Sequence, residues 1–184
     1  MFTFSKTRYL VYTALFCALA VVVKRFSSFV ILGGAGKISL FCVPVFLAGL
    51  MLGPICGAVT GAVGDILGSI LLSYSIAPLL SFNFALMGAV MGLCTYRIKS
   101  IKYLWLRAVI AGIFIYAVCT MGIGTLAQTL PPTMYYDTFT AAFMVRLPVQ
   151  WINSAINLAL TIALFYALIP LTKILKWQTK YPQE

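Results

Sequence analysis

The sequence predicts an all-α membrane protein, a compact bundle of six transmembrane helices that forms a single domain over residues 1–184. Of its 184 residues, 62% are hydrophobic and only 9% are charged, a balance that soluble domains do not show. A membrane-spanning helix needs about 20 apolar residues, so a chain of this length accommodates about six helices with short connections. No room remains for a second, soluble domain.

Six apolar runs can form these helices, and polar, Gly-rich or Pro-containing segments separate them. The expected helices are 7–23, 39–52, 55–72, 79–96, 104–126 and 139–171. The first reaches the basic pair Lys24 and Arg25, and its apolar pattern also allows it to continue to residue 32. A Gly-rich loop at 33–36 is then too flexible to remain helical.

Small residues mark two helices as close-packing elements. Ala14 and Ala18, four apart in the first helix, lie on one face and make a flat seam for another helix. The second helix is short for a full span, and Gly53-Pro54 predicts the turn that follows it. The third helix carries a glycine at nearly every turn, together with the one deeply placed carboxylate, Asp65. No basic residue lies four positions from this carboxylate. Two readings stay open: a protonated or hydrogen-bonded structural group, or a group that faces a partner protein.

The remaining connections differ in charge. The loop at 73–78 is uncharged, whereas the loop at 97–102 is the most basic of the chain. The segment at 130–137 is too polar and Pro-rich to span a membrane. The sixth helix is long enough to begin outside the membrane, and Pro148 is a candidate kink.

The charge distribution orients the bundle. Six spans place both termini on one side, together with the basic loop after the fourth helix and the basic C-terminal tail. By the positive-inside rule this side is the cytoplasm, so we expect both termini there. The excess of basic residues therefore indicates membrane topology, and nucleic acid is not expected as a partner.

Four cations remain on the outer side in this topology: Lys24, Arg25, Lys37 and Arg146. One reading is that they reach the lipid headgroups. The other is that they converge on an anionic ligand, for which the planar guanidinium of arginine is well suited. Polar groups near the outer helix ends complete such a site, and nearby aromatic rings (Phe82, Tyr135, Tyr136, Trp151) are placed to stack on a flat ligand. The candidate substrate-binding residues are Arg25, Lys37, Ser39, Phe82, Asn83, Gln128, Arg146 and Gln150.

Enzymatic and metal chemistry are not expected. The chain has no histidine, no paired carboxylates and no CxxC spacing, so neither a catalytic dyad nor a metal site is predicted. A GxxxxGK[ST] loop is also absent, so the chain does not hydrolyse ATP by that device.

Several motifs resemble one family. The stretch KISLFCVPVFLAGLMLGP, followed by GAVGDILGS, resembles the substrate-binding S components of energy-coupling factor (ECF) vitamin transporters, and the folate-type members are the most similar. Arg25-Phe26 is similar to the end of their first helix, and the segment 81–93 to the entrance of their fourth. Arg146 with Gln150 resembles an arginine and a polar residue early in their sixth helix.

The resemblance implies a mechanism. An S component is a multi-pass protein of the bacterial plasma membrane that captures its vitamin from outside. The resemblance to folate-type members implies that the vitamin is folate. It docks through the Ala14 and Ala18 face onto a transmembrane coupling subunit, which is joined to two cytoplasmic ATPases. It then releases the vitamin inward. No cofactor of its own is implied, because ATP is used by the partner subunits.

Alternatives remain open at this point. Folate-type members often carry an Asn-Thr-Leu-Trp-like stretch late in the fifth helix, where this chain has Gly124-Thr125-Leu126-Ala127. Pantothenate-type members share much of the pattern of the second and third helices, so the vitamin can be pantothenate or another. A stand-alone secondary transporter is the further alternative, although the chain shows no inverted repeat.

Overall fold

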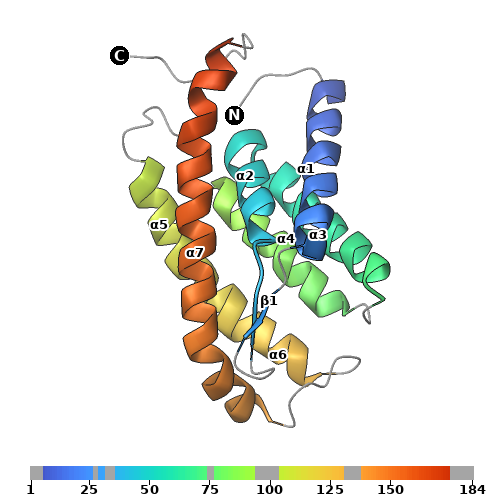
Figure 1. Cartoon of the computed structure of the whole chain (residues 1–184), viewed down its shortest axis with the longest axis vertical. Coiled ribbons are helices and arrows are strands. Elements are labelled where there is room, and N and C mark those ends of the chain that lie inside the picture. Colours follow the sequence, from blue (N-terminus) through green and yellow to red (C-terminus); the bar gives the residue numbers. More distant parts are fainter. Residues whose placement is uncertain are drawn as a thin grey trace.

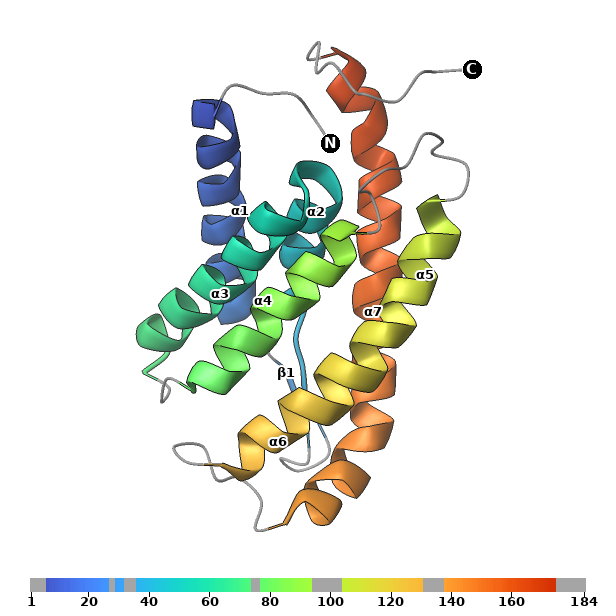
Figure 2. The same cartoon turned by 180° about the vertical axis from the view of Figure 1, so that it is seen from behind.

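The computed structural model of the protein describes residues 6–26, 29–31, 36–73, 77–93, 104–130 and 138–174. Over this part of the chain, six helical rods form one bundle, as the sequence predicts (Figures 1 and 2). The elements are α1 (Lys6–Phe26), β1 (Phe29–Ile31), β2 (Gly36–Ile38), α2 (Cys42–Leu52), α3 (Pro54–Leu71), α4 (Pro78–Leu93), α5 (Leu104–Phe114), η3 (Ile115–Ile123), α6 (Gly124–Thr129) and α7 (Phe139–Ile174).

Four of the rods are long and apolar enough to cross a membrane: Tyr9–Phe26, Pro54–Leu71, Trp105–Thr129 and Ala142–Leu168. The other two, α2 and α4, have 11 and 16 residues. An 11-residue helix is about 16 Å long and does not span the hydrocarbon layer. Instead α2 is buried along nearly its whole length, so protein rather than lipid surrounds it.

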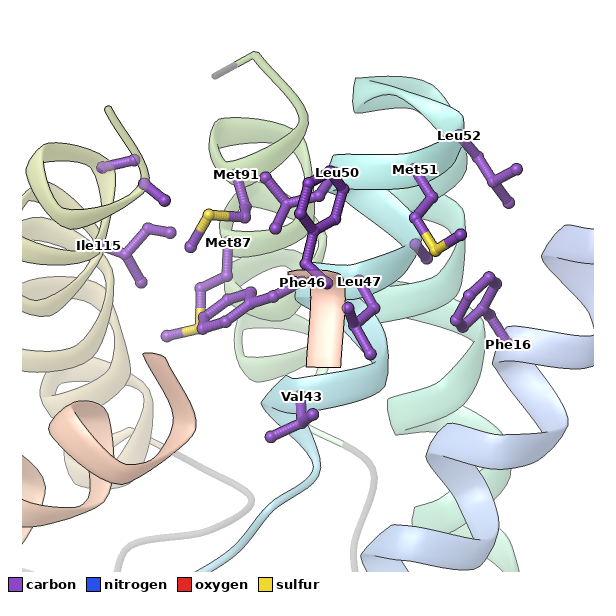
Figure 3. Close-up of a cluster of buried hydrophobic side chains, with 14 of the residues drawn as sticks. Phe16, Val43, Phe46, Leu47, Leu50, Met51, Leu52, Met87, Met91 and Ile115 are labelled. Carbon is purple, nitrogen blue, oxygen red and sulfur yellow. The ribbon is translucent and has the colours of Figure 1, made fainter. Parts of the chain in front are cut away.

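The central helix α2 organises the apolar core (Figure 3). Phe46, Leu47 and Leu50 of α2 lie between Phe16 of α1 on one side and Met91 of α4 on the other. Burial of such side chains on all sides of a helix is typical of the interior of a bundle.

Glycines bring α2, α3 and α4 into backbone contact. A Cβ added to Gly49 would lie 2.6 Å from the carbonyl oxygen of Gly88, and one added to Gly61 would collide with the carbonyl of Phe84. The turn between α2 and α3 occurs at Gly53, where φ is 105°, and Pro54 begins α3. The glycines of the sequence therefore pack these helices more closely than a methyl group would allow.

The segment after α1 differs from the prediction. The helix ends at Phe26, so its continuation to residue 32 is wrong, and β1 instead pairs with β2 in an antiparallel ladder that joins Val30 to Lys37. The helix expected from residue 39 begins only at Cys42, because the backbone of Ser39 is hydrogen-bonded to α7. Pro148 does not interrupt α7. Residues 33–35 and 94–96 of the expected loop and fourth helix lie outside the described residues.

The helices also differ from the prediction near the fifth rod. Between α5 and α6 the backbone forms the π-helix η3, and the rod continues to Thr129, beyond the expected end at residue 126. The beginning of α1 and the end of α7 lie at the same end of the bundle (Figure 1). The end of α1, the β1–β2 pair, α6 and the beginning of α7 lie toward the opposite end, which we call the hairpin end (Figure 2).

Candidate ligand-binding site

A polar stripe on α7 faces the interior at the hairpin end. Arg146, Gln150, Asn153 and Asn157 follow one another at steps of four, three and four residues, which places them on one face of the helix. Arg146 is 6% exposed and Asn157 is 2% exposed, and the two residues between them are half-buried. Buried polar side chains in a membrane bundle require partners, and their positions mark candidate sites.

Arg146 meets residues of α4 and α6. Its Nη1 donates a hydrogen bond of 3.0 Å to Oγ1 of Thr125, which is fully buried. A Cβ added to Gly124 would lie 3.2 Å from Nδ2 of Asn83 and 3.8 Å from Nη2 of Arg146. Two polar side chains, one from α4 and one from α7, therefore approach a single glycine of α6. We call Asn83, Gly124, Thr125 and Arg146 the Arg146 cluster.

The Arg146 cluster offers charge and an open acceptor. Asn83 is 1% exposed, and its Oδ1 has no hydrogen-bond partner within the described residues. A buried acceptor without a donor costs about 1–3 kcal/mol, so native proteins rarely leave one unless a ligand, ion or water completes it. A molecule that donates a hydrogen bond to Asn83 and accepts from Arg146 satisfies the cluster.

A second group of polar contacts joins Ser39 to α7. The backbone N–H of Ser39 donates to Oδ1 of Asn153 at 3.2 Å, and Nδ2 of Asn157 donates to the Ser39 carbonyl at 2.9 Å. Nδ2 of Asn153 donates in turn to Oε1 of Gln150 at 3.3 Å. The predicted residues Ser39 and Gln150 are thus brought together through Asn153.

Sequence reasoning missed four of these residues. Asn153 and Asn157 continue the spacing of Arg146 and Gln150 along one helix face, so that periodicity was a signal that could have identified them. Thr125 and Gly124 carried no such signal, since a threonine and a glycine are ordinary residues of an apolar helix.

The other predicted residues take different positions. Gln128 is half-buried on α6, one turn beyond Gly124 and on the same face. Lys37 pairs through its backbone in β2, and its side chain lies outside the described residues. Arg25, in the last turn of α1, is exposed, and Phe82 is 57% exposed. The structure therefore does not place Arg25 and Phe82 in the buried cluster.

Aromatic rings flank the polar stripe on its outer side. Trp151 is 56% exposed and packs on Tyr116 of η3 with ring centroids 4.5 Å apart. The hydroxyl of Tyr116 donates to the carbonyl of Leu147 at 3.4 Å. These contacts join η3 to α7 beside the cluster. The other two predicted aromatics, Tyr135 and Tyr136, lie outside the described residues.

Lys24 is engaged elsewhere, which corrects its assignment as an outer cation available to a ligand. Its Nζ lies 2.7 Å from Oδ1 of Asp65 and donates to Oγ of Ser69 at 3.0 Å. The hydroxyl of Ser81 in α4 donates to Oδ2 of the same carboxylate at 2.7 Å. The partner that sequence reasoning did not find for Asp65 thus comes from α1, 41 residues away.

The predicted docking pair lies on the outside of the bundle. Ala14 and Ala18 are both exposed on α1, beside the exposed Val11, Leu15 and Val22. The opposite face of α1, which carries Phe16 and Ala20, is buried against the bundle. An apolar surface that includes two small side chains is therefore available to lipid or to another helix.

Comparison with known proteins finds one matching family and solved structures of similar fold. The model of the family described as "ECF transporter, substrate-specific component" matches residues 8–165. A crystal structure of FolT bound with folic acid is similar with a TM-score of 0.73 and 25% identity, covering 88% of this chain and 94% of that chain. No curated protein matches the chain.

A second solved structure has the same fold. The S component of a bacterial ECF transporter is similar with a TM-score of 0.69 and 23% identity, covering 92% of this chain and 99% of that chain. At that identity the likeness concerns the fold alone.

Proposed function

This chain belongs to the family of substrate-specific components of ECF transporters, and from that premise we propose that it binds folate at the Arg146 cluster. A substrate-binding component of the membrane is the coarser conclusion, and the family match carries it. The choice of folate rests on the chemistry of the cluster and on the similarity to FolT, which is bound with folic acid in its structure.

The observation that carries the proposal is the open acceptor of Asn83 beside Arg146. Nδ2 of Asn83 and Nη2 of Arg146 both lie within 4 Å of the Cβ position of Gly124, so the two side chains are close enough to bind one ligand. A ligand with a donor and an acceptor along one edge can pair with both Oδ1 of Asn83 and the guanidinium. The pteridine ring of folate has such an edge, because its ring amide holds N–H and C=O on the same side.

Pantothenate fits this edge less well. Its amide is acyclic and therefore trans, so the N–H and C=O groups point in opposite directions. Asn83 and Arg146 cannot both bind that amide from one side. The cluster therefore favours a cyclic amide over an acyclic one, and folate over pantothenate.

The transport step is assigned to partner subunits. We propose that the hairpin end faces outward and the termini face the cytoplasm, in keeping with the basic residues of the loop after α4 and of the C-terminal tail. The exposed Ala14 and Ala18 face of α1 then docks on a transmembrane coupling subunit, and two cytoplasmic ATPases supply the energy. Ligand binding shifts docking only by its different affinity for the free and the docked states.

Calorimetry on the purified protein in detergent tests the proposed ligand. We expect folic acid to bind with nanomolar affinity in the absence of ATP, and pantothenate to bind at least a hundredfold more weakly. Tighter binding of pantothenate would overturn the choice of vitamin. Vitamin uptake into liposomes by this chain alone would overturn the dependence on partner subunits.

A further inference from the structure

The ion pair between α1 and α3 lies outside the Arg146 cluster, and its contacts lead toward the site. We infer that Lys24 and Asp65 are positioning residues for the ligand site: through Phe41 they hold Ser39 in the place where α7 binds it. The inference rests on the proposed function in so far as Ser39 belongs to the ligand site. Its geometry is independent of the vitamin.

Helix α3 binds the Lys24 side chain through hydrogen bonds and packing. The Nζ of Lys24 binds three oxygens of α3, namely Oδ1 and the carbonyl of Asp65 and the hydroxyl of Ser69, at 2.7–3.0 Å. A Cβ added to Gly68 would lie 2.6 Å from Cδ of Lys24, so the lysine stem packs directly against this glycine. The ammonium is therefore held by contacts along its whole side chain.

The ion pair also contacts Phe41, the residue before α2. The Nζ of Lys24 lies 5.4 Å from the centre of the Phe41 ring, within the range of a cation–π contact. Phe41 is 3% exposed and packs edge-on against Phe84 of α4 at 4.9 Å. A Cβ on Gly64 would touch the same ring at 3.4 Å. The ring is thus enclosed by α1, α3 and α4.

Phe41 is in turn hydrogen-bonded to Ser39. The backbone N–H of Phe41 donates to Oγ of Ser39 at 3.3 Å, which closes a tight turn between β2 and α2. The backbone of Ser39 is bonded on its other side to Asn153 and Asn157. Because only one residue separates Phe41 from Ser39, a displaced ring moves the groups that α7 binds.

The presence of an ion pair between α1 and α3 indicates a role besides stability, because uncharged residues could stabilise this contact equally well. Replacing a buried ion pair by uncharged residues of similar volume is often neutral for stability, whereas removing one partner is strongly destabilising. Directional contacts from one ammonium to α3 and to the Phe41 ring specify a position that apolar packing does not. Stability and binding should therefore respond differently when the pair is neutralised.

The test compares K24M, D65N and the double variant K24M/D65N, with I66M as a control at an exposed neighbour of Asp65. We expect both single variants to lose thermal stability and the double variant to melt within a few degrees of the natural protein. The dissociation rate of folic acid from the double variant should nevertheless rise at least tenfold. A double variant that melts normally and releases folic acid at the natural rate would overturn the inference.

A second measurement needs no ligand. Cysteines introduced by S39C and N153C should form a disulfide under mild oxidation, detected as a linked peptide by mass spectrometry. In the K24M/D65N background we expect its yield to fall at least threefold, and an unchanged yield would contradict the inference. If the natural protein does not bind folic acid, the proposed ligand fails, and the disulfide yield still decides whether the ion pair positions Ser39.

Discussion

Asn83 illustrates how one side chain can be costly for the empty protein and useful for the bound one. Its Oδ1 lies in the interior without a donor among the described residues. Its Nδ2 lies near Gly124, which Nη2 of Arg146 also approaches. A leucine, which has the same branched shape, removes the open acceptor. The cost of the natural residue is therefore explained if a ligand N–H pairs with it.

We expect Asn83→Leu to leave the unfolding free energy of the empty protein unchanged or to raise it by about 1 kcal/mol. The affinity for folic acid should fall at least tenfold. Thermal unfolding in detergent, with and without folic acid, measures both effects. Asn157→Leu is the comparison: its Oδ1 also lacks a donor among the described residues, but its Nδ2 bonds to Ser39 and Asn153 are lost, so stability should fall. A large loss of stability in Asn83→Leu without ligand would contradict this account.

Gly124 is the second decisive residue, because it has no side chain where the folate-type pattern carries a larger one. Nδ2 of Asn83 and Nη2 of Arg146 lie close to its Cβ position. We expect Gly124→Ala to weaken folic acid binding about tenfold, since its methyl group would lie 3.1 Å from the Cys119 carbonyl and 3.2 Å from Nδ2 of Asn83.

Gly122→Ala provides the comparison on the same rod. A Cβ at Gly122 meets only the carbonyl of Ala117, at the ordinary distance of 3.9 Å. Calorimetry with folic acid should give the natural affinity for this variant. Equal affinities for the two alanine variants would show that the space at Gly124 is not part of the site.

At the scale of elements, α1 has two faces, one buried in the bundle and one exposed. Its inner face carries Phe16 and Lys24 into the bundle, whereas Ala14 and Ala18 lie exposed on the outer face. A bulky residue on the outer face leaves the core untouched but prevents close approach of another helix.

Ala14→Trp should therefore retain the natural affinity for folic acid and abolish ATP-driven uptake by the assembled transporter. Ala159→Trp, an equally exposed position on α7, should preserve both. Calorimetry on the isolated chain and uptake in proteoliposomes with the partner subunits separate the two effects. Normal uptake by Ala14→Trp would refute docking through this face.

The elements also show what could be read from the sequence. Six helices were predictable, because apolar runs of membrane length and the Gly53-Pro54 turn are local signals. The β1–β2 pair was not, since β-branched residues after Phe26 are compatible with a helix in a membrane. The late start of α2 depends on bonds from Asn153 and Asn157 to Ser39, which lie more than 110 residues apart in sequence.

For the whole molecule, the site lies where two groups of helices meet. Helices α2, α3 and α4 are joined by glycine contacts, and Lys24 ties α1 to α3. The Arg146 cluster combines Asn83 from this group with residues of α6 and α7. A ligand that bonds to both groups stabilises the bundle as a whole, because it binds the folded state alone.

This arrangement shows how much of the candidate site could be predicted from the sequence. Arg146, Asn83, Gln150 and Ser39 were predictable as polar residues at the outer helix ends, and the structure places them in two adjoining networks. The pairing of Lys24 with Asp65 was not predictable, because nothing local joins α1 to α3. The charge pattern of the sequence therefore could not show that Lys24 binds α3 whereas Arg146 lies in the cluster.

The most direct test of the account is a structure of this protein bound to folic acid. We predict that the ring amide of the pteridine lies at the Arg146 cluster, with its N–H at about 2.7–3.2 Å from Oδ1 of Asn83 and its carbonyl at a similar distance from the guanidinium of Arg146. A pteridine ring bound elsewhere, with Asn83 still unpaired, would contradict the central claim.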